Sequence, residues 1–168
     1  MWDFECPVCK NDGCVPAGGP KKSSVLIVGD QPGEQEVLKG QPFTGPTGGV
    51  LRAELARLHL DLSSMRLCNL WLHPHAAKFD PKCLEYSANK VLEEARGKRV
   101  ILLLGSEPVK YFCSSSVEGY NGLILDSPWF ADAVVLACVQ PAIVFHSGLG
   151  ELRFALSRFA AVLEKEKV

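Results

Sequence analysis

The sequence predicts an α/β fold of three layers, in which a central four-stranded parallel sheet is flanked by helices. Short, continuous apolar runs such as VLIVG at 25–29 and VILLL at 100–104 are typical of strands buried on both faces. Segments with apolar residues at helical spacing separate these runs, and this alternation favours a parallel sheet covered on both sides. Because a chain of 168 residues suits one buried core, we expect a single domain over residues 1–168.

The elements follow a polar, Gly- and Pro-rich segment at 1–23, which has too little apolar content to fold alone and needs a metal or the main body to order it. The expected strands are residues 25–29, 66–71, 100–104 and 134–139. The expected helices are residues 50–60, 81–96, 106–113 and 151–166. Helix 81–96 has Asp80 as its N-cap and Pro81 at its first position, and Gly97 ends it.

Composition narrows the class of protein. An apolar fraction of 47% indicates a folded globular chain, and a net charge of -1 neither favours nor excludes a local DNA-binding patch. No apolar run reaches the roughly 18 residues of a transmembrane helix, and the start MWDFECPVC lacks the pattern of a secretory signal. We therefore expect a cytoplasmic monomer whose seven cysteines are thiols or metal ligands.

Functional loops of parallel α/β sheets lie at the carboxyl ends of the strands. Three such loops carry unusual polar residues, after Gly29, after Asn69 and around His146. The first is long and Gly-rich, which fits either turn formation or ligand binding, and it matches neither a dinucleotide loop nor a P-loop. Its lone aromatic, Phe43, would provide a stacking surface for a base.

This loop carries a family resemblance. GDQPG at 29–33, followed by GQPFTGPTG at 40–48, resembles the first motif of the family-four uracil-DNA glycosylases, which reads G-E-A/Q-P-G and then G-x-P-F-V-G-x-A-G. The Gln form is typical of close relatives that trap uracil covalently. The resemblance implies a uracil-DNA glycosylase-like fold and a repair enzyme that hydrolyses the N-glycosidic bond of uracil extruded from DNA.

The resemblance also implies roles for single residues. Phe43 would stack on uracil, Asn69 would read the O4 and N3–H edge, and Gln31 would add hydrogen bonds. Asp30 stands where the family has Glu, to position water or stabilise the sugar cation. The family's last motif is H-P-S, and FHSGLGELR at 145–153 is the candidate, so His146 would donate to uracil O2. The residues implied in DNA-contacting loops are Gly33, Ser147, Gly148 and Arg153.

The C-x-x-C pair Cys6 and Cys9 indicates a metal site in a cytoplasmic chain. By position, the resemblance adds His73 and Cys83 to complete a 4Fe-4S cluster, with His known at this place in the covalent-trapping relatives. Two alternatives stay open: Cys14 replaces His73 as the fourth ligand, or the site holds structural zinc.

The covalent-trapping relatives carry a Lys-Arg-Arg-Ile-His insertion between the third and fourth ligands. Residues 74–82 lack that sequence, so we expect no stable covalent adduct. Two rival functions remain at this stage. One is a catalytically weak or inactive uracil-DNA glycosylase-like protein that binds DNA or a partner, and the other is a small-molecule-binding α/β domain with a zinc-pinned N-terminal segment.

Overall fold

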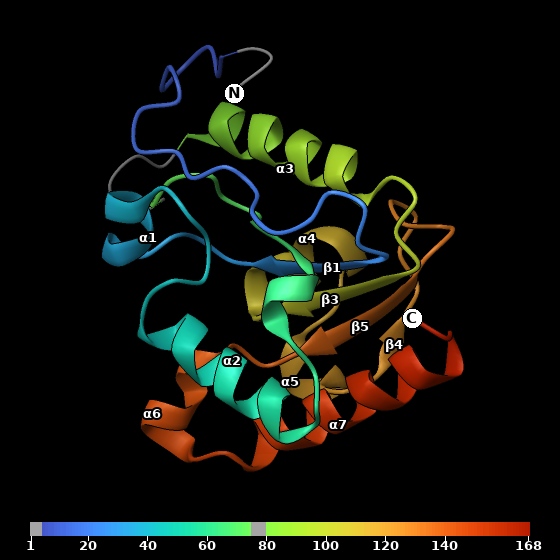
Figure 1. The fold of residues 1–168 in the computed structure, drawn as a ribbon. Helices are drawn as coiled ribbons and strands as arrows, with labels where there is room; N and C mark the ends of the chain where they lie inside the picture. Colours follow the sequence, from blue (N-terminus) through green and yellow to red (C-terminus); the bar gives the residue numbers. More distant parts are fainter. Residues whose placement is uncertain (1–4, 75–79) are drawn as a thin grey trace.

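A five-stranded sheet forms the centre of the protein over the residues that the computed structural model describes, 5–74 and 80–168 (Figure 1). Its order is β2-β1-β3-β5-β4. The parallel strands are β1 (Val25–Gly29), β2 (Arg66–Asn69), β3 (Val100–Leu104) and β5 (Val134–Cys138). These are the four predicted strands, and the α/β fold is confirmed.

The prediction missed one strand. β4 (Ile124–Leu125) pairs antiparallel with β5 at the edge of the sheet. Two residues are too few to show any periodicity, and Ile124 is 61% exposed, so no buried apolar run marked it.

Seven α-helices surround the sheet in the described ranges. They are α1 (Glu34–Lys39), α2 (Pro46–Arg57), α3 (Pro81–Ala95), α4 (Ser106–Cys113), α5 (Val117–Tyr120), α6 (Val144–Ser147) and α7 (Gly150–Lys165). Short 3-10 turns lie at Leu62–Ser64 and Pro141–Ile143. The four predicted helices are present with ends shifted by a few residues. The three missed helices have four to six residues, too few for a helical repeat of apolar positions.

Figure 1 shows α3 on one side of the sheet and α2 with α7 on the other, which gives the three predicted layers. The Asp80 carboxylate caps α3 by accepting a hydrogen bond from the Lys82 N–H at 2.8 Å, as predicted. None of the described helices has both the length and the apolar composition needed to cross a membrane.

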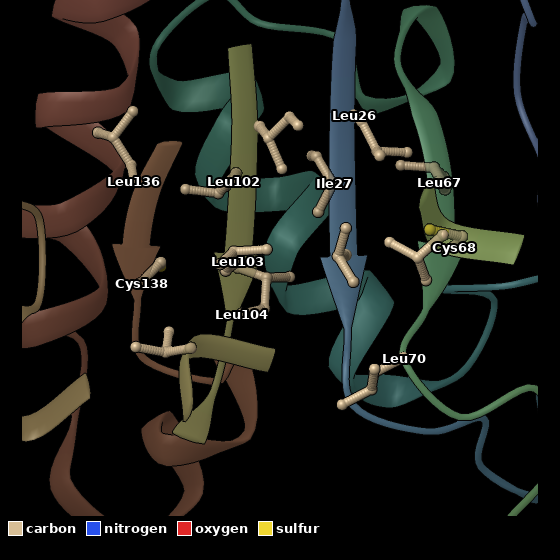
Figure 2. Close-up of a cluster of buried hydrophobic side chains, with 14 of the residues drawn as sticks. Leu26, Ile27, Leu67, Cys68, Leu70, Leu102, Leu103, Leu104, Leu136 and Cys138 are labelled. Atoms are coloured by element: carbon tan, nitrogen blue, oxygen red, sulfur yellow. The ribbon is translucent and has the colours of Figure 1, made fainter. Parts of the chain in front are cut away.

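The core lies between the sheet and these helices. Every residue of β1 and β3 is buried, as the continuous apolar runs predicted. Figure 2 shows leucine, isoleucine and cysteine side chains of the four parallel strands gathered in this core. Trp71, Phe112 and Phe159 are the bulkiest of the fully buried side chains there.

The chain order creates a switch point beside β1. From β1 the chain crosses to β2 on one side, and it later returns to β3 on the other side of β1. Because the loops leave in opposite directions, a crevice opens at the carboxyl ends of the strands there. The ladder between β1 and β2 extends into this region, since Leu70 N–H donates to the Gly29 carbonyl and Trp71 N–H to the Asp30 carbonyl, both at 2.8 Å.

The N-terminal segment is held along β2 by hydrogen bonds. Gly18 and Leu67 exchange backbone hydrogen bonds of 2.8 and 2.9 Å, and Val15 N–H donates to the Leu72 carbonyl at 2.7 Å. The buried Lys98 ammonium donates to the carbonyls of Lys21 and Ser23. The main body therefore orders this segment through its own polar contacts, in addition to the cysteines described below.

Candidate active site

A cavity of about 890 Å³ opens at the carboxyl edge of the sheet. The ends of all four parallel strands contribute to its lining, through Gly29, Asn69, Leu104 and Gln140. Helix α1 and the loop between β1 and α1 supply much of the remaining wall, and Phe43 adds to it from the loop between α1 and α2. Its volume lies in the range of about 300–1,000 Å³ that is usual for small-molecule sites.

Phe43 and Asn69 meet over Gly29 in this cavity. Gly29 is paired in register with Asn69. A methyl group at residue 29 would contact the Oδ1 of Asn69 and lie 2.8 Å from the Cζ of Phe43. Both side chains are largely buried, with Asn69 only 4% exposed. The absence of a side chain on Gly29 therefore allows an aromatic ring and a carboxamide to lie side by side at the end of β1.

A buried glutamate closes the loop that carries Phe43. The Gly45 N–H donates to the Oε1 of Glu36 at 3.0 Å, and a Cβ on either Gly33 or Gly45 would come within 2.9 Å of this carboxylate. Phe43 itself adopts a left-handed conformation, with φ of 57°. Such backbone is costly for an aromatic residue and persists only where its surroundings impose it. The surrounding loop therefore holds the Phe43 backbone in this conformation.

The charge in the cavity is negative. Asp30 is half-buried with its Oδ1 atom inside the protein, and Glu34 and Glu36 also line the wall. Gln31, which the resemblance assigns to uracil binding, lines the cavity beside Asp30. Among the lining residues that the structure describes, there is no lysine, arginine or histidine. This environment favours positive charge on a bound group and provides neutral donors for any negative charge.

A cluster of thiols lies away from this cavity, where the N-terminal segment meets the start of α3. The Sγ atoms of Cys6, Cys9 and Cys83 lie within 4.8 Å of one another. Cys6 and Cys83 are 3.7 Å apart, and Cys14 is 4.0 Å from Cys9. The structure thus brings together three of the four predicted ligands, and it places the alternative, Cys14, beside them.

Each thiol in this cluster affects the pKa of its neighbours. Burial, together with the charge of Cys9, raises the pKa of Cys14 to about 12. Burial and the neighbouring Cys6 raise the pKa of Cys83 to about 12. Burial also opposes ionisation of Cys6, but the backbone N–H groups of Cys9 and Val8 leave its pKa lowered. Several thiolates this close require a cation, so the donor set fits a metal centre.

His73 is not one of that group of three residues, but its ring has the surroundings of a metal-ligating histidine. Its side chain is 1% exposed, and its Nδ1 lies 3.3 Å from the Pro74 carbonyl oxygen. Its Nε2 is buried and has no hydrogen-bond partner among the described residues. A ring that donates from Nδ1 to a carbonyl and leaves Nε2 free is the usual arrangement of a ligating histidine.

A model of the uracil DNA glycosylase superfamily matches residues 16–159 of the chain. The chain belongs to this superfamily. Among similar proteins, the type-4 uracil-DNA glycosylase of Archaeoglobus fulgidus is 27% identical over 145 residues, covering 79% of this chain and 72% of that protein. The one from Sulfurisphaera tokodaii is 26% identical over 131 residues, covering 71% of this chain but only 59% of that protein. The one from Pyrobaculum aerophilum is 36% identical over 67 residues, which are 39% of this chain and 34% of that protein.

The resemblance implies an H-P-S-like motif at His146, but the structure does not bring this residue to the cavity. His146 is exposed on α6 and is not among the described lining residues. Gln140 and Pro141, which follow β5 after Val139, line the cavity instead. Gln140-Pro141-Ala142 has a polar residue, a proline and a small residue in the order of H-P-S, whereas FHSG lacks the proline. The proline just after a buried strand was the signal that could have found Gln140.

The residues predicted in DNA-contacting loops divide into three cases. Gly33 lines the cavity at the start of α1. Ser147 and Gly148 are exposed at the end of α6 and away from the lining. Arg153 forms a bidentate ion pair with buried Glu54 of α2, at 2.8 and 3.3 Å. This pair ties α7 to α2 and lowers the pKa of Glu54 through the hydrogen bond from Arg153.

Proposed function

We propose that this protein is a uracil-DNA glycosylase, which hydrolyses the bond between uracil and deoxyribose in DNA. The observation that supports this most directly is the meeting of Phe43 and Asn69 over Gly29, inside a cavity of about 890 Å³. A base cannot react inside the duplex, so it must be extruded into such a pocket. The Phe43 ring provides a stacking face, and the Asn69 carboxamide provides the acceptor for N3–H and the donor to O4 that uracil requires.

The negative cavity suits the remaining chemistry. As the bond from the sugar to uracil breaks, positive charge develops on the sugar, as in other glycoside hydrolyses. The half-buried Asp30 carboxylate would stabilise that charge and orient the attacking water. Glu34 and Glu36 add to the negative field from α1.

We propose further that Cys6, Cys9, Cys83 and His73 hold a 4Fe-4S cluster. Thiolates are the usual ligands of such clusters, with histidine as an occasional substitute, and the orphaned Nε2 of His73 supports its inclusion. The cluster would be structural, because the cysteines tie the N-terminal segment to the start of α3. Iron and sulfide analysis separates this assignment from zinc in the same thiol site.

The function is tested by measuring release of free uracil from a uracil-containing single-stranded oligonucleotide, with anaerobically purified protein of known iron content. Asn69→Ala removes two hydrogen bonds from a buried site, at about 1–3 kcal/mol each, so kcat/KM should fall about 30-fold to about 10⁴-fold. Asn89→Ala, on the exposed surface of α3, is the matched control and should leave release unchanged. Equal activity of the two variants would exclude Asn69 from the pocket.

A further inference from the structure

Two residues past the end of β5, Gln140 presents a polar side chain to the cavity. Its stem packs on Gly105, where a Cβ would lie 3.5, 3.8 and 3.9 Å from the Cβ, Cγ and Cδ of Gln140. The side chain does not cap the 3-10 turn that follows. It is also exposed at the mouth of the cavity, so its carboxamide is accessible to a bound group.

Gln140 and Asn69 approach the cavity from opposite sides. Asn69 ends β2 and Gln140 follows β5, with β1 and β3 between them in the sheet. Three strand spacings of about 4.8 Å separate β2 from β5 by about 14 Å. The side chains of Asn69 and Gln140 both line the cavity between these strands. A uracil that presents O4 and N3–H to Asn69 has its O2 on the other side of N3, toward the part of the wall that β3 and β5 supply.

We propose that Gln140 is a catalytic residue of this chain, whose Nε2–H donates a hydrogen bond to uracil O2 as the base departs. This inference rests on the proposed glycosylase function. The C1′–N1 bond breaks with its electron pair remaining on uracil. A water oxygen bonds to C1′ and releases its proton to Asp30 or solvent, and the uracil anion takes a proton from solvent. Gln140 donates a hydrogen bond throughout and loses no proton.

A carboxamide donor has consequences that a histidine would not. It carries no charge at any pH in the working range, whereas histidine titrates between about pH 5 and 8. Among the residues that the structure describes, the titratable groups that line the cavity are the carboxylates of Asp30, Glu34 and Glu36. These carboxylates are shared by every variant of residue 140, so a difference in pH profile between variants reports on residue 140 itself.

The test is the single-turnover rate of uracil release, together with the affinity for an oligonucleotide that carries a non-cleavable deoxyuridine analogue. Removing one donor from a developing oxyanion typically costs about 10²–10³-fold in rate. Because Gln140 is exposed, we expect Gln140→Ala to lower the rate about 10- to 100-fold, with the affinity changed less than about threefold. The loss from Gln140→Ala should exceed the loss from His146→Ala. Gln140→His should restore release and add a dependence on pH between about 5 and 8.

The outcomes separate this inference from the function on which it rests. If the natural protein and Gln140→Ala release uracil at the same rate, the role of Gln140 is overturned and the glycosylase function stands. A larger loss from His146→Ala than from Gln140→Ala would do the same. No release by either the natural protein or Gln140→His, with full iron content, would overturn both. Release that appears only in Gln140→His would overturn the proposed activity of the natural protein and support the position of residue 140 beside uracil O2.

Discussion

Gly29→Ala tests the geometry of the cavity with a single methyl group. The new Cβ would contact the Asn69 Oδ1 and lie 2.8 Å from the Phe43 Cζ. Contacts of a Cβ below 3.0 Å are essentially never seen, and ordinary contact begins at 3.4 Å. The Phe43 ring must therefore retreat by 3.4 − 2.8 = 0.6 Å, and the Asn69 carboxamide, which is closer, must move further.

These shifts affect activity more than stability. Inserting a methyl group into a packed site costs about 1–3 kcal/mol, which a domain of about 5–15 kcal/mol stability tolerates. Displacing a group that holds substrate by about 1 Å costs about 10²-fold in rate. We therefore expect Gly29→Ala to fold and to release uracil about 10²-fold more slowly than the natural protein.

Gly49→Ala is the matched control for Gly29→Ala. Gly49 lies inside α2, and a Cβ there would meet no atom within 4 Å apart from its chain neighbours and its own helical backbone, so alanine should stabilise the helix by up to about 1 kcal/mol. Thermal unfolding and single-turnover uracil release are measured for both variants. A folded Gly29→Ala protein with the rate of Gly49→Ala would refute the assignment of Phe43 and Asn69 to the base pocket.

The remaining predictions concern the metal site and acid stability. Pulsed EPR of the reduced cluster should show nitrogen coupling, and His73→Cys should remove this coupling while the iron is retained. Cys14→Ser should keep both the coupling and the iron. Loss of iron from Cys14→Ser alone would make Cys14 the fourth ligand. Removing the iron should make the N-terminal segment easier for a protease to cleave. Equal cleavage rates with and without iron would mean that the hydrogen bonds of this segment are enough to hold it in place. The pKa of Glu94 is lowered by its hydrogen bonds from Arg66, at 2.6 and 2.8 Å, so the stability it contributes is present above the ordinary glutamate pKa of about 4.5 and lost as pH falls below it. Glu94→Gln should flatten the fall in unfolding free energy between about pH 5 and 3, and a slope as steep as that of the exposed control Glu118→Gln would contradict this.

Local patterns in the sequence were sufficient for the fold class and part of the site. Continuous apolar runs predicted the four parallel strands, and the Asp80-Pro81 start predicted α3. The C-x-x-C pair predicted a metal site, and its two cysteines lie beside Cys83. The long loop with its lone Phe43 was predicted to offer a stacking surface for a base, and Phe43 lines the cavity. These features act between residues close in sequence, through side-chain periodicity, capping and turn chemistry.

Only the tertiary structure decided which side chains reach the cavity and which find other partners. The pairing of β1 with β2 sets Gly29 against Asn69, and the end of β5 presents Gln140, while His146 is carried outward on α6. Arg153, expected near DNA, is held by Glu54, 99 residues away in the chain. Such outcomes depend on strand register and helix packing between distant segments. Residue type and local spacing, which are all that a single sequence displays, do not specify them.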